Sequence, residues 1–370
     1  MILQNDFKRQ WKFVEERVLN AVRLVGSSGR YILGKEVESF EIALAEFWGV
    51  SYAVGIGSGL DAIEIGLRCL DLQPGEKVLT TPLSAFATTL AILRAGGMPL
   101  FVDVDDFGGI DLRQCRQLLE KEKSIRFFVP VHLYGIPLQM QELSRLKEDF
   151  RLQIVEDCAQ SIGAAYAGIE TGMVGQVAAT SFYPTKNLGA LGDAGALLTR
   201  DAALAEKAKT LRNYGQTEHY VHAALGLNSR LDEVQAAVMH HALLPHVATW
   251  TEARRSAAQK YLAQIRHPSI QLLSPDPEME PGWHIFPVLA GEGLRDQLRD
   301  YLASCGIMTG IHYPRLICDQ AALGKGGWEA AREPVKARAF VSRELSLPIH
   351  PFLTDPEVDT VIAACNAWKV

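Results

Sequence analysis

One lysine of this chain stands in a sequence context that suits it to chemistry. Lys186 lies in the segment SFYPTKNLG (residues 181–189), a hydroxyl- and glycine-bearing loop that follows a short apolar run. A lysine in a confined site loses its proton more readily than a solvated lysine, and the neutral amine can then form a Schiff base. Ser181, at the start of the same segment, could bind a phosphate oxygen. A single loop lysine is usually only solvated, so the motifs around it decide its role.

The segment GIGSGLDA (residues 55–62) is a second candidate, because it ends an apolar run and begins an amphipathic one. Backbone N–H groups and the helix dipole converge at such a junction, which makes it suitable for a phosphate group. A dinucleotide-binding turn needs a third glycine where Leu60 stands, so an NAD-dependent dehydrogenase is disfavoured. A glycine-rich turn without a ligand is the plain structural alternative.

An acidic pair ends the apolar run QIVED (residues 153–157). Ligands bind at the carboxyl ends of the strands in α/β sheets, and Asp157 would lie at such an end. A carboxylate there can hold a pyridine nitrogen protonated and so make the ring an electron sink. Glu156 should point to the opposite face of the sheet, since side chains alternate along a strand. The alternative role for Asp157 is a helix cap.

Other residues are weaker candidates. Phe86 follows a predicted strand and could stack on a planar ring, although most such aromatic side chains belong to the core. His132, His240, His241 and His246 lack a second set of ligands at matching spacing, so no metal site is expected. The chain also contains no Gly-x-Ser-x-Gly elbow and no Walker loop.

These segments imply the elements that must position them. Strands are expected at residues 52–56, 77–81, 99–103, 126–131, 153–157 and 178–182, and helices at 60–70, 85–94, 111–122 and 139–148. Apolar strands that alternate with amphipathic helices predict a mostly parallel sheet covered on both faces. Residues 202–263 have a largely helical pattern, and a helix at 291–306 followed by a strand at 307–313 is expected in a mixed C-terminal part. We predict a large domain of residues 1–247 and a smaller one of residues 248–370.

Composition and charge exclude several classes of protein. With 48% hydrophobic and 22% charged residues among 370, the chain has the composition of an ordinary globular protein. Its net charge of −6 does not favour binding to nucleic acid or to an anionic membrane. The six cysteines are scattered without a Cys-x-x-Cys pair, which indicates reduced thiols. No apolar run reaches membrane-spanning length and the charged N-terminal segment is unlike a signal peptide, so a cytoplasmic location is expected.

Taken together, these motifs are similar to those of a known family. The chain resembles the pyridoxal-phosphate-dependent nucleotide-sugar aminotransferases of the DegT/DnrJ/EryC1/StrS family over nearly its whole length. Further matching motifs are PVHLYG (130–135), RNYG (212–215), GLNSRLDE (226–233), GIHYP (310–314) and LSLP (345–348). The resemblance implies the α/β architecture called fold type I, of the aspartate aminotransferase superfamily. Its large domain has a mostly parallel seven-stranded sheet flanked by helices, and its smaller C-terminal domain is also α/β.

The resemblance also implies roles for single residues around the cofactor, pyridoxal 5'-phosphate. Lys186 forms the Schiff base with the cofactor and later moves a proton. Asp157 pairs with the pyridine nitrogen, Phe86 stacks on the ring, and Gln160 lies near the ring hydroxyl. The phosphate is held by a set made up of Ser58, Gly59, Leu60 and Ser181.

A partner subunit is implied as well. In this family the asparagine that matches Asn228 reaches the phosphate from the neighbouring chain, which implies a homodimer with shared active sites. Tyr183, His312 and Tyr313 match positions that border the nucleotide sugar. The family usually has Gly-Asp-Gly-Gly where this chain has Ala194 as the third residue. The extra methyl group is tolerated if the backbone there needs no positive φ.

The implied reaction is a ping-pong transamination from L-glutamate to a nucleotide-linked keto-sugar, in deoxysugar or polysaccharide biosynthesis. The GSGLDA segment favours amination at C3 of a dTDP-3-keto-6-deoxyhexose. Amination at C4 of a UDP- or GDP-4-keto sugar is the alternative, and a non-catalytic regulatory member of the family is a further one. A sugar dehydratase of the same fold is disfavoured, because those members carry histidine in place of Lys186.

Overall fold

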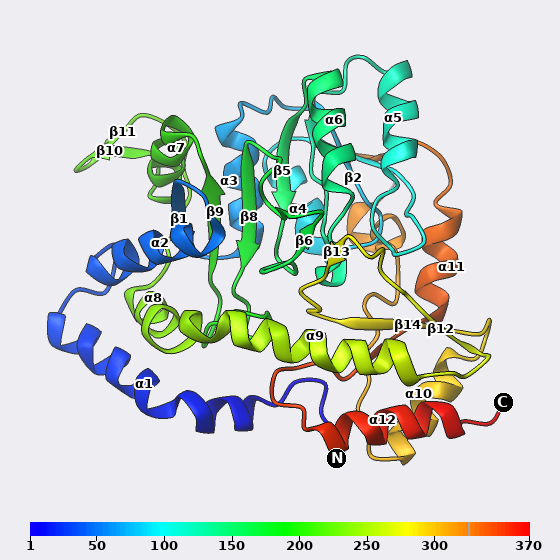
Figure 1. Cartoon of the computed structure of the whole chain (residues 1–370). Helices are drawn as coiled ribbons and strands as arrows, with labels where there is room; N and C mark the ends of the chain where they lie inside the picture. Colours follow the sequence, from blue (N-terminus) through cyan, green and yellow to red (C-terminus); the bar gives the residue numbers. More distant parts are fainter. Residues whose placement is uncertain (325) are drawn as a thin grey trace.

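A large central sheet organises the first part of the chain. The computed structural model describes residues 1–324 and 326–370. Within them, the sheet has the strand order β1-β9-β8-β5-β4-β2-β3-β15 (Figure 1). Its strands are β1 (Tyr52–Ile56), β2 (Lys77–Thr80), β3 (Met98–Phe101), β4 (Phe127–Phe128), β5 (Gln153–Asp157), β8 (Val177–Ser181), β9 (Gly195–Thr199) and β15 (Glu329–Ala330). Neighbouring strands are parallel, except that β9 runs antiparallel to both β1 and β8.

The sheet confirms the predicted mostly parallel α/β fold, with one correction. Seven strands come from residues 52–199, in agreement with the expected seven, but the described chain adds an eighth, β15, which pairs with β3. β15 has only two residues, Glu329 and Ala330. A run of two residues has no periodicity, so no sequence pattern could predict this strand. The six strands expected from the pattern all form, whereas β9 lies outside them.

The two faces of the sheet are covered by different helices. One layer contains α3 (Gly59–Cys69), α4 (Phe86–Arg94) and α7 (Ala202–Arg212), and the other contains α5 (Leu112–Lys121) and α6 (Met140–Phe150). Adjacent strand residues alternate between these layers, so that Val78 packs with the first and Leu79 with the second. Because both faces are buried, the strands are continuous apolar runs in the sequence.

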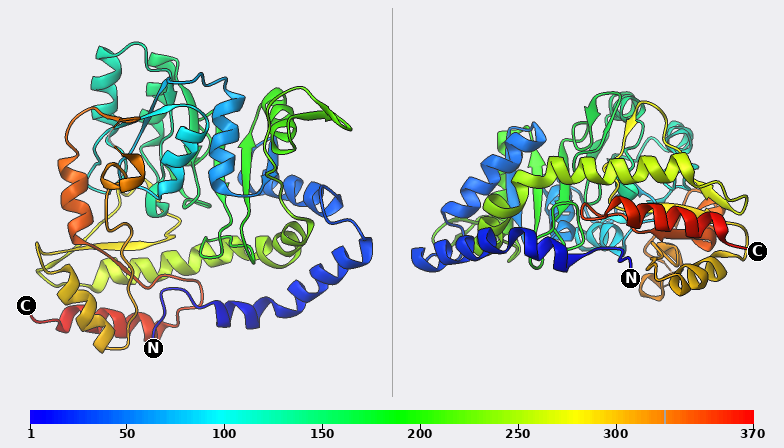
Figure 2. Two further views of the ribbon diagram at one scale, coloured as in Figure 1. Left: turned by 180° about the vertical axis from the view of Figure 1, so that it is seen from behind. Right: turned by 60° about the horizontal axis from the view of Figure 1, so that its bottom comes forward.

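Helices from two distant parts of the chain frame the sheet. α1 (Phe7–Ser28) extends along the outside of the molecule and is followed by α2 (Lys35–Trp48) (Figures 1 and 2). Asp6 caps α1 by accepting the N–H of Arg9 at 2.9 Å, and Gly29, with φ of 66°, ends it. A second helical stretch is formed by α8 (Glu233–Val238), a π-helix (Met239–Leu243), a 3-10 turn (Leu244–His246) and α9 (Val247–Gln264). The long helix α9 crosses below the sheet toward the C-terminal part (Figure 1).

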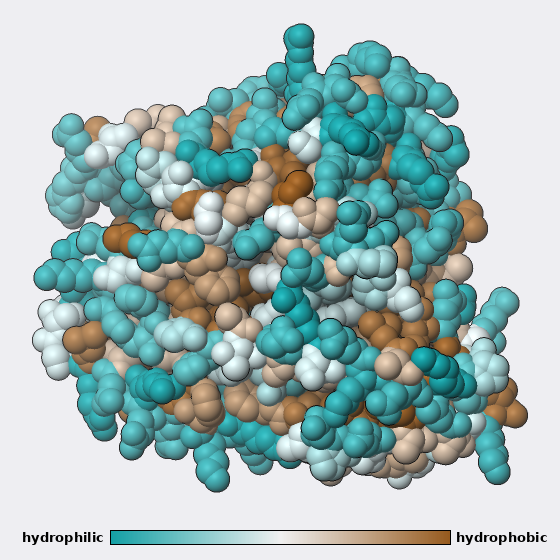
Figure 3. All heavy atoms as spheres, viewed as in Figure 1, coloured by the Kyte–Doolittle hydropathy of each residue, from teal (hydrophilic) through white to brown (hydrophobic). Residues whose placement is uncertain are grey.

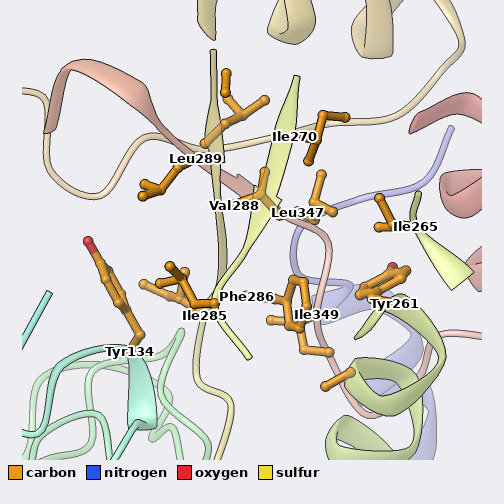
Figure 4. Packing of buried hydrophobic residues seen from close by; sticks show 14 of the residues in the cluster. Tyr134, Tyr261, Ile265, Ile270, Ile285, Phe286, Val288, Leu289, Leu347 and Ile349 are labelled. Carbon is orange, nitrogen blue, oxygen red and sulfur yellow. The ribbon is translucent and has the colours of Figure 1, made fainter. Parts of the chain in front are cut away.

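The C-terminal part is built on a small antiparallel sheet. This sheet consists of β12 (Ile270–Leu272), β14 (Phe286–Ala290) and β16 (Glu344–Leu347), and its helices are α10 (Arg295–Ser304), α11 (Val335–Arg343) and α12 (Asp355–Ala367). Figure 4 shows Phe286 and Leu347 of this sheet packed near Tyr261 of α9, with Tyr134 at the side of the same cluster. The C-terminal core therefore includes side chains from the first part of the chain.

The predicted strand at residues 307–313 is wrong. In the described chain only isolated bridges occur there, between Ile307 and Ile2 and between Gly310 and Ser346. Backbone pairing with β16 ends at Gly310. The residues that follow are held by side chains, since Glu344 Oε2 accepts the N–H of His312 and Gln160 Nε2 donates to Tyr313 Oη.

The predicted domain boundary after residue 247 coincides with the start of α9. Trp250 of this helix packs in the cluster that contains α1 and α2, and Tyr261 packs in the C-terminal core. One helix thus contributes to both cores. The division into domains of residues 1–247 and 248–370 stays a prediction.

Short elements complete the described chain. They are β6 (Ala165–Tyr166), β7 (Ile169–Glu170), β13 (Met279–Glu280), the hairpin strands β10 (Gln216–Glu218) and β11 (Val221–His222), and 3-10 turns at Leu133–Gly135, Ile317–Asp319 and Ala321–Leu323. The β10–β11 hairpin projects from the molecule beside α7 (Figure 1). Among the described residues, no helix has the length and apolar character needed to cross a membrane.

Candidate active site

Three predicted site segments end at one edge of the large sheet. β1 and β8 each run antiparallel to β9, and β5 runs parallel to β8, so the carboxyl ends of β1, β5 and β8 lie together. Asp157 is the last residue of β5, Ser181 is the last of β8, and Ser58 lies two residues after β1. That edge faces α9 (Figure 1). It is the edge at which open α/β sheets bind ligands.

The turn after β1 forms a cradle for an anion. Ser58 caps α3, and its Oγ accepts the N–H of Asp61 at 3.1 Å. The amides of Gly59 and Leu60 belong to the first turn of the helix, where backbone N–H groups have no partner within the helix. Glycine is required at 59, because a Cβ there would lie 2.6 Å from the Cβ of Ser181. The helix N-terminus and the Ser181 hydroxyl together suit a phosphate group.

Asp157 is held by a threonine from a neighbouring helix. Thr88 Oγ1 donates to Asp157 Oδ2 at 2.7 Å, and the N–H of Ala159 donates to Oδ1 at 3.1 Å. Burial raises the pKa of the Asp157 carboxyl, and the hydrogen bond from Thr88 acts in the opposite direction. The pKa is raised although these hydrogen bonds and the charge of Lys186 lower it, so a cationic ring nitrogen would be a favourable further partner for this carboxyl group.

Glu156 faces the other way, as predicted. Its carboxylate accepts a hydrogen bond from His132 Nε2 at 2.9 Å and from the N–H of Gly172 at 2.9 Å. The N–H of Leu138 donates to His132 Nδ1 at 3.2 Å, so the ring hydrogen lies on Nε2. The side chains of His132, Glu156 and Cys158 come close together, but hydrogen bonds already account for the histidine and the glutamate. That the chain holds no metal stays a prediction.

Lys186 lies in the loop between β8 and β9, within electrostatic reach of Asp157. Burial lowers the pKa of its amine to about 8, and the charge of Asp157 acts in the opposite direction. Part of the amine is therefore neutral near pH 7, and the neutral form is the nucleophile. Burial and then the charge of Lys186 lower the pKa of His312 to about 4 and that of His284 as well. The cleft beside the lysine is lined by Asn5, Asp6, Phe7, Gln10, Pro184, Thr185, Asn187, Trp250, Arg254, His350, Pro351 and Phe352.

Gln160 and Tyr313 join the large sheet to the C-terminal part. Gln160 Nε2 donates to Tyr313 Oη at 3.0 Å, and its Oε1 accepts the N–H of Tyr134 at 2.6 Å. Burial raises the pKa of Tyr313 to about 12, so the phenol keeps its proton at neutral pH. Tyr134 Oη donates to the carbonyl oxygen of His312. The structure thus places Gln160, His312 and Tyr313 in one hydrogen-bonded group.

Phe86, Tyr183 and Asn228 have less defined surroundings. Phe86 begins α4, two residues before Thr88, and its partly buried side chain packs against the cluster of Phe101, Ile317 and Leu323. Tyr183 and Asn228 are exposed. Their predicted roles in stacking on the ring, in binding the sugar and in the site of a partner chain stay predictions.

Sequence reasoning missed the residues that support the predicted ones. Thr88 binds Asp157, and Glu344 together with Ser346 binds His312. Ser346 lies within the LSLP motif, which was the only sequence signal for these two residues. No local signal identifies a threonine in a helix as the partner of a carboxylate 69 residues away.

The residues gathered at this edge fit pyridoxal 5'-phosphate. A lysine with a lowered pKa, a buried carboxylate and a helix N-terminus beside a serine hydroxyl supply an amine, a partner for the ring nitrogen and a phosphate cradle. Fold and site together define a pyridoxal-phosphate-dependent transferase of fold type I. More narrowly, the chain belongs to the DegT/DnrJ/EryC1/StrS aminotransferase family, whose model matches residues 13–366.

Individual similar proteins agree with this assignment. A dTDP-3-amino-3,4,6-trideoxy-alpha-D-glucose transaminase from Streptomyces venezuelae is 39% identical over 98% of this chain and 95% of its own length. The crystal structure of S. venezuelae DesV in complex with a ketimine intermediate has a TM-score of 0.93 and 39% identity, covering 99% of this chain and 98% of that one. The erythromycin biosynthesis sensory transduction protein EryC1 from Saccharopolyspora erythraea is also 39% identical, over 98% of each chain. The predicted pyridoxal-phosphate-dependent sugar aminotransferase is confirmed.

Proposed function

We propose that the protein transfers an amino group from L-glutamate to C3 of a dTDP-linked 3-keto-6-deoxyhexose by a ping-pong reaction. The observation that carries the amino transfer is Lys186 within electrostatic reach of Asp157, next to an anion cradle. The C3 assignment is supported by the name of the S. venezuelae relative, which places the amine at C3. Amination at C4 of a UDP- or GDP-4-keto sugar is the competing assignment. A cytoplasmic location is part of the proposal.

Each half of such a reaction moves a proton at carbon, and the residues of this chain are arranged to move it. Pyridoxal phosphate, when bound, supplies a ring that takes up the electron pair left behind by the departing proton. Asp157, buried and hydrogen-bonded to Thr88, puts a negative charge where it stabilises a protonated ring nitrogen. Lys186 Nζ, partly neutral at pH 7, would take the proton from the amino carbon and deliver it to the other carbon bonded to the transferred nitrogen. The amide of Gly59 and the Ser181 hydroxyl orient the phosphate end.

We further propose a homodimer whose active sites contain residues of both chains. Exposed apolar side chains occur on α1, on α2 and its preceding loop, and around the β10–β11 hairpin: Phe13, Leu19, Val22, Leu24, Tyr31, Ile32, Ile42, Tyr214, Tyr220, Val221 and Leu225. Figure 3 shows apolar patches among the hydrophilic surface on the side of the molecule that α1 and α2 form. Exposed apolar side chains that gather on one side of a molecule support an interface with another chain. Asn228 is exposed, while the next residue, Ser229, accepts the N–H of Gly57 at 3.1 Å beside the cradle.

Mixing two impaired variants tests the shared site. Lys186→Ala removes the amine, and Asn228→Asp puts a negative charge where the phosphate is expected. If Asn228 acts in the partner's site, a hybrid dimer contains one site with neither change. Random mixing of the two chains should then restore activity to about one quarter of the wild-type value.

Co-expression of the two variants with different tags allows the hybrid dimers to be isolated. Each variant expressed alone is the control and should stay impaired. Hybrid dimers no more active than the average of the two variants would show that Asn228 does not act in the partner's site, and the shared-site proposal would be wrong.

A panel of keto-sugar nucleotides tests the substrate assignment. With L-glutamate as the amino donor, the dTDP-3-keto-6-deoxyhexose should be aminated at least about tenfold faster than UDP- or GDP-4-keto sugars. A sugar with its keto group at another carbon would leave polar groups of the binding site without hydrogen-bond partners. Mass spectrometry detects the product and NMR locates the amine. A product aminated at C4 would refute the C3 assignment and leave the aminotransferase in place.

A further inference from the structure

A buried carboxyl group lies next to His312 and has no part in the chemistry described so far. Glu344 and Ser346 stand two residues apart on β16, so their side chains leave the same face of the strand. Both residues are completely buried. A buried carboxyl group is stable only where hydrogen bonds satisfy it, and here they lead to the imidazole.

Three hydrogen bonds connect the carboxyl group to His312. Glu344 Oε2 accepts the backbone N–H of His312 at 2.6 Å, and Oε1 lies 2.5 Å from Ser346 Oγ. Ser346 Oγ in turn lies 2.8 Å from His312 Nδ1. The backbones of Gly310 and Ser346 are paired at 3.0 and 2.8 Å, and a Cβ at Gly310 would lie 2.7 Å from His312 Cε1. The ring is therefore held in place from two sides.

The direction of these hydrogen bonds depends on one proton. The backbone N–H can only donate, so Oε2 always accepts, whereas the serine hydroxyl donates its single hydrogen to only one of two neighbours. If Glu344 is ionised, Ser346 donates to it and accepts from Nδ1, which leaves Nε2 without a hydrogen. If Glu344 is protonated, Oε1 donates to Ser346, Ser346 donates to Nδ1, and the ring hydrogen lies on Nε2.

We propose that Glu344 and Ser346 are positioning residues for His312. Through the serine hydroxyl, Glu344 determines which ring nitrogen carries the hydrogen, and its protonated form makes His312 Nε2 a hydrogen-bond donor to an oxygen of the bound keto-sugar. The identity of that acceptor rests on the proposed function, whereas the tautomer of His312 does not depend on it.

The charges around the ring support this role. Burial and the charge of Lys186 lower the pKa of His312 to about 4, so the ring is neutral at pH 7 and must adopt one tautomer. Burial raises the pKa of Glu344 to about 8, against the hydrogen bonds from Ser346 and from the His312 backbone. Glu344 is therefore mostly protonated at pH 7, and His312 is a donor there. The other titratable groups near the pair are Tyr134, Tyr313, His284, Asp157 and Arg295.

Glu344→Gln tests the connection without removing a heavy atom. The backbone N–H of His312 cannot reverse, so the amide oxygen must replace Oε2 and the amide NH2 must face Ser346. Ser346 then has to donate to Nδ1, and the hydrogen stays on Nε2 at every pH. Burial lowers the pKa of the free Lys186 amine to about 8, so this substitution, rather than pH alone, identifies Glu344 as the controlling group.

Nitrogen NMR of the holoenzyme with 15N-labelled histidine reads out the tautomer, and a His312→Asn variant assigns the signal. Between about pH 6 and pH 9.5, wild type is expected to change from hydrogen on Nε2 to hydrogen on Nδ1. Glu344→Gln should stay in the first form, and Ser346→Ala should lose the change. A wild-type signal that keeps one tautomer throughout, or a Glu344→Gln signal that changes as wild type does, would overturn the proposal.

Steady-state kinetics give a second readout. Above pH 8 the KM of wild type for the keto-sugar should rise about three- to tenfold relative to that of Glu344→Gln, because one hydrogen bond is lost, while kcat changes little. Thr251→Val is the matched control, since Thr251 has a buried hydroxyl without a hydrogen-bond partner among the described residues. It should leave both readouts unchanged. An inactive protein with the expected tautomers would refute the proposed function and leave this inference standing.

Discussion

Replacing Lys186 by alanine is expected to lower the single-turnover rate of amino transfer from L-glutamate by at least about three orders of magnitude, because one amine serves as both nucleophile and proton carrier. Burial lowers the pKa of this amine to about 8, which keeps part of it neutral at pH 7. A methyl group can serve in neither role. The rate is measured in a single turnover, as the change in cofactor absorbance after L-glutamate is added.

Lys147→Ala is the matched control for this prediction. Lys147 lies on α6, and burial lowers its pKa too, but its amine donates to the carbonyl of Val174, near the amino end of β8. Its variant should keep the wild-type single-turnover rate within about twofold, as expected of a change away from the site. A Lys186→Ala protein that converts its cofactor at the wild-type rate would show that Lys186 is neither the nucleophile nor the proton carrier.

Asp157→Asn is expected to lower kcat by about 10²- to 10⁴-fold, in the range of lost proton-transfer catalysis. Asparagine has nearly the same shape and can still accept a hydrogen bond from Thr88. It has no charge, so it does not hold the ring nitrogen protonated, and the ring becomes a weaker electron acceptor. The affinity for pyridoxal phosphate should fall as well, which a fluorescence titration measures.

The same variant should affect the stability of the two forms of the protein in opposite ways. Without cofactor, burial raises the pKa of Asp157, so its contribution to stability is present at low pH and is lost as the pH rises through the folded pKa. At pH 7 asparagine avoids this loss, and the apo Tm should equal or exceed that of wild type. The rise in Tm on adding pyridoxal phosphate should shrink. Thr88→Val, which keeps the charge and removes its donor, should lower the apo Tm, and an Asp157→Asn protein that behaves like it would contradict this account.

The edge of the sheet that carries the site could be predicted from local patterns. β1 and β5 coincide with the predicted strands at residues 52–56 and 153–157, because strands buried on both faces are continuous apolar runs. Alternation with helices implies parallel neighbours, and the carboxyl ends of parallel strands share an edge. The sequence alone therefore predicts that Asp157 and Ser181 lie at the same edge of the sheet.

Elements that depend on distant partners could not be predicted in the same way. β9 reverses direction between β1 and β8, and β15 joins β3 from the far end of the chain. The run at residues 307–313 has the pattern of a strand, yet in the described chain its backbone pairs with β16 only at Gly310, and its other bridge joins Ile307 to Ile2. Such choices are made by tertiary packing, which overrides local propensity.

The departure from the family pattern at Ala194 has a simple structural explanation. The described residues with a positive φ do not include Ala194, so its methyl group causes no backbone strain. The strict requirement for glycine falls on the next residue. A Cβ at Gly195 would lie 2.6 Å from the backbone nitrogen of Gly59, within the phosphate cradle.

The loop that carries Lys186 is closed at its base by neighbouring strands. Ser181 pairs with Gly195 between β8 and β9, and the N–H of Phe182 donates to the carbonyl of Ala194 at 2.8 Å. A loop tied at both ends samples few conformations, so most of its ordering is completed when the protein folds. The amine is thus preorganised before any ligand arrives, and little conformational entropy remains to be lost on cofactor capture. Association with pyridoxal phosphate should consequently be limited by encounter rather than by rearrangement of this loop.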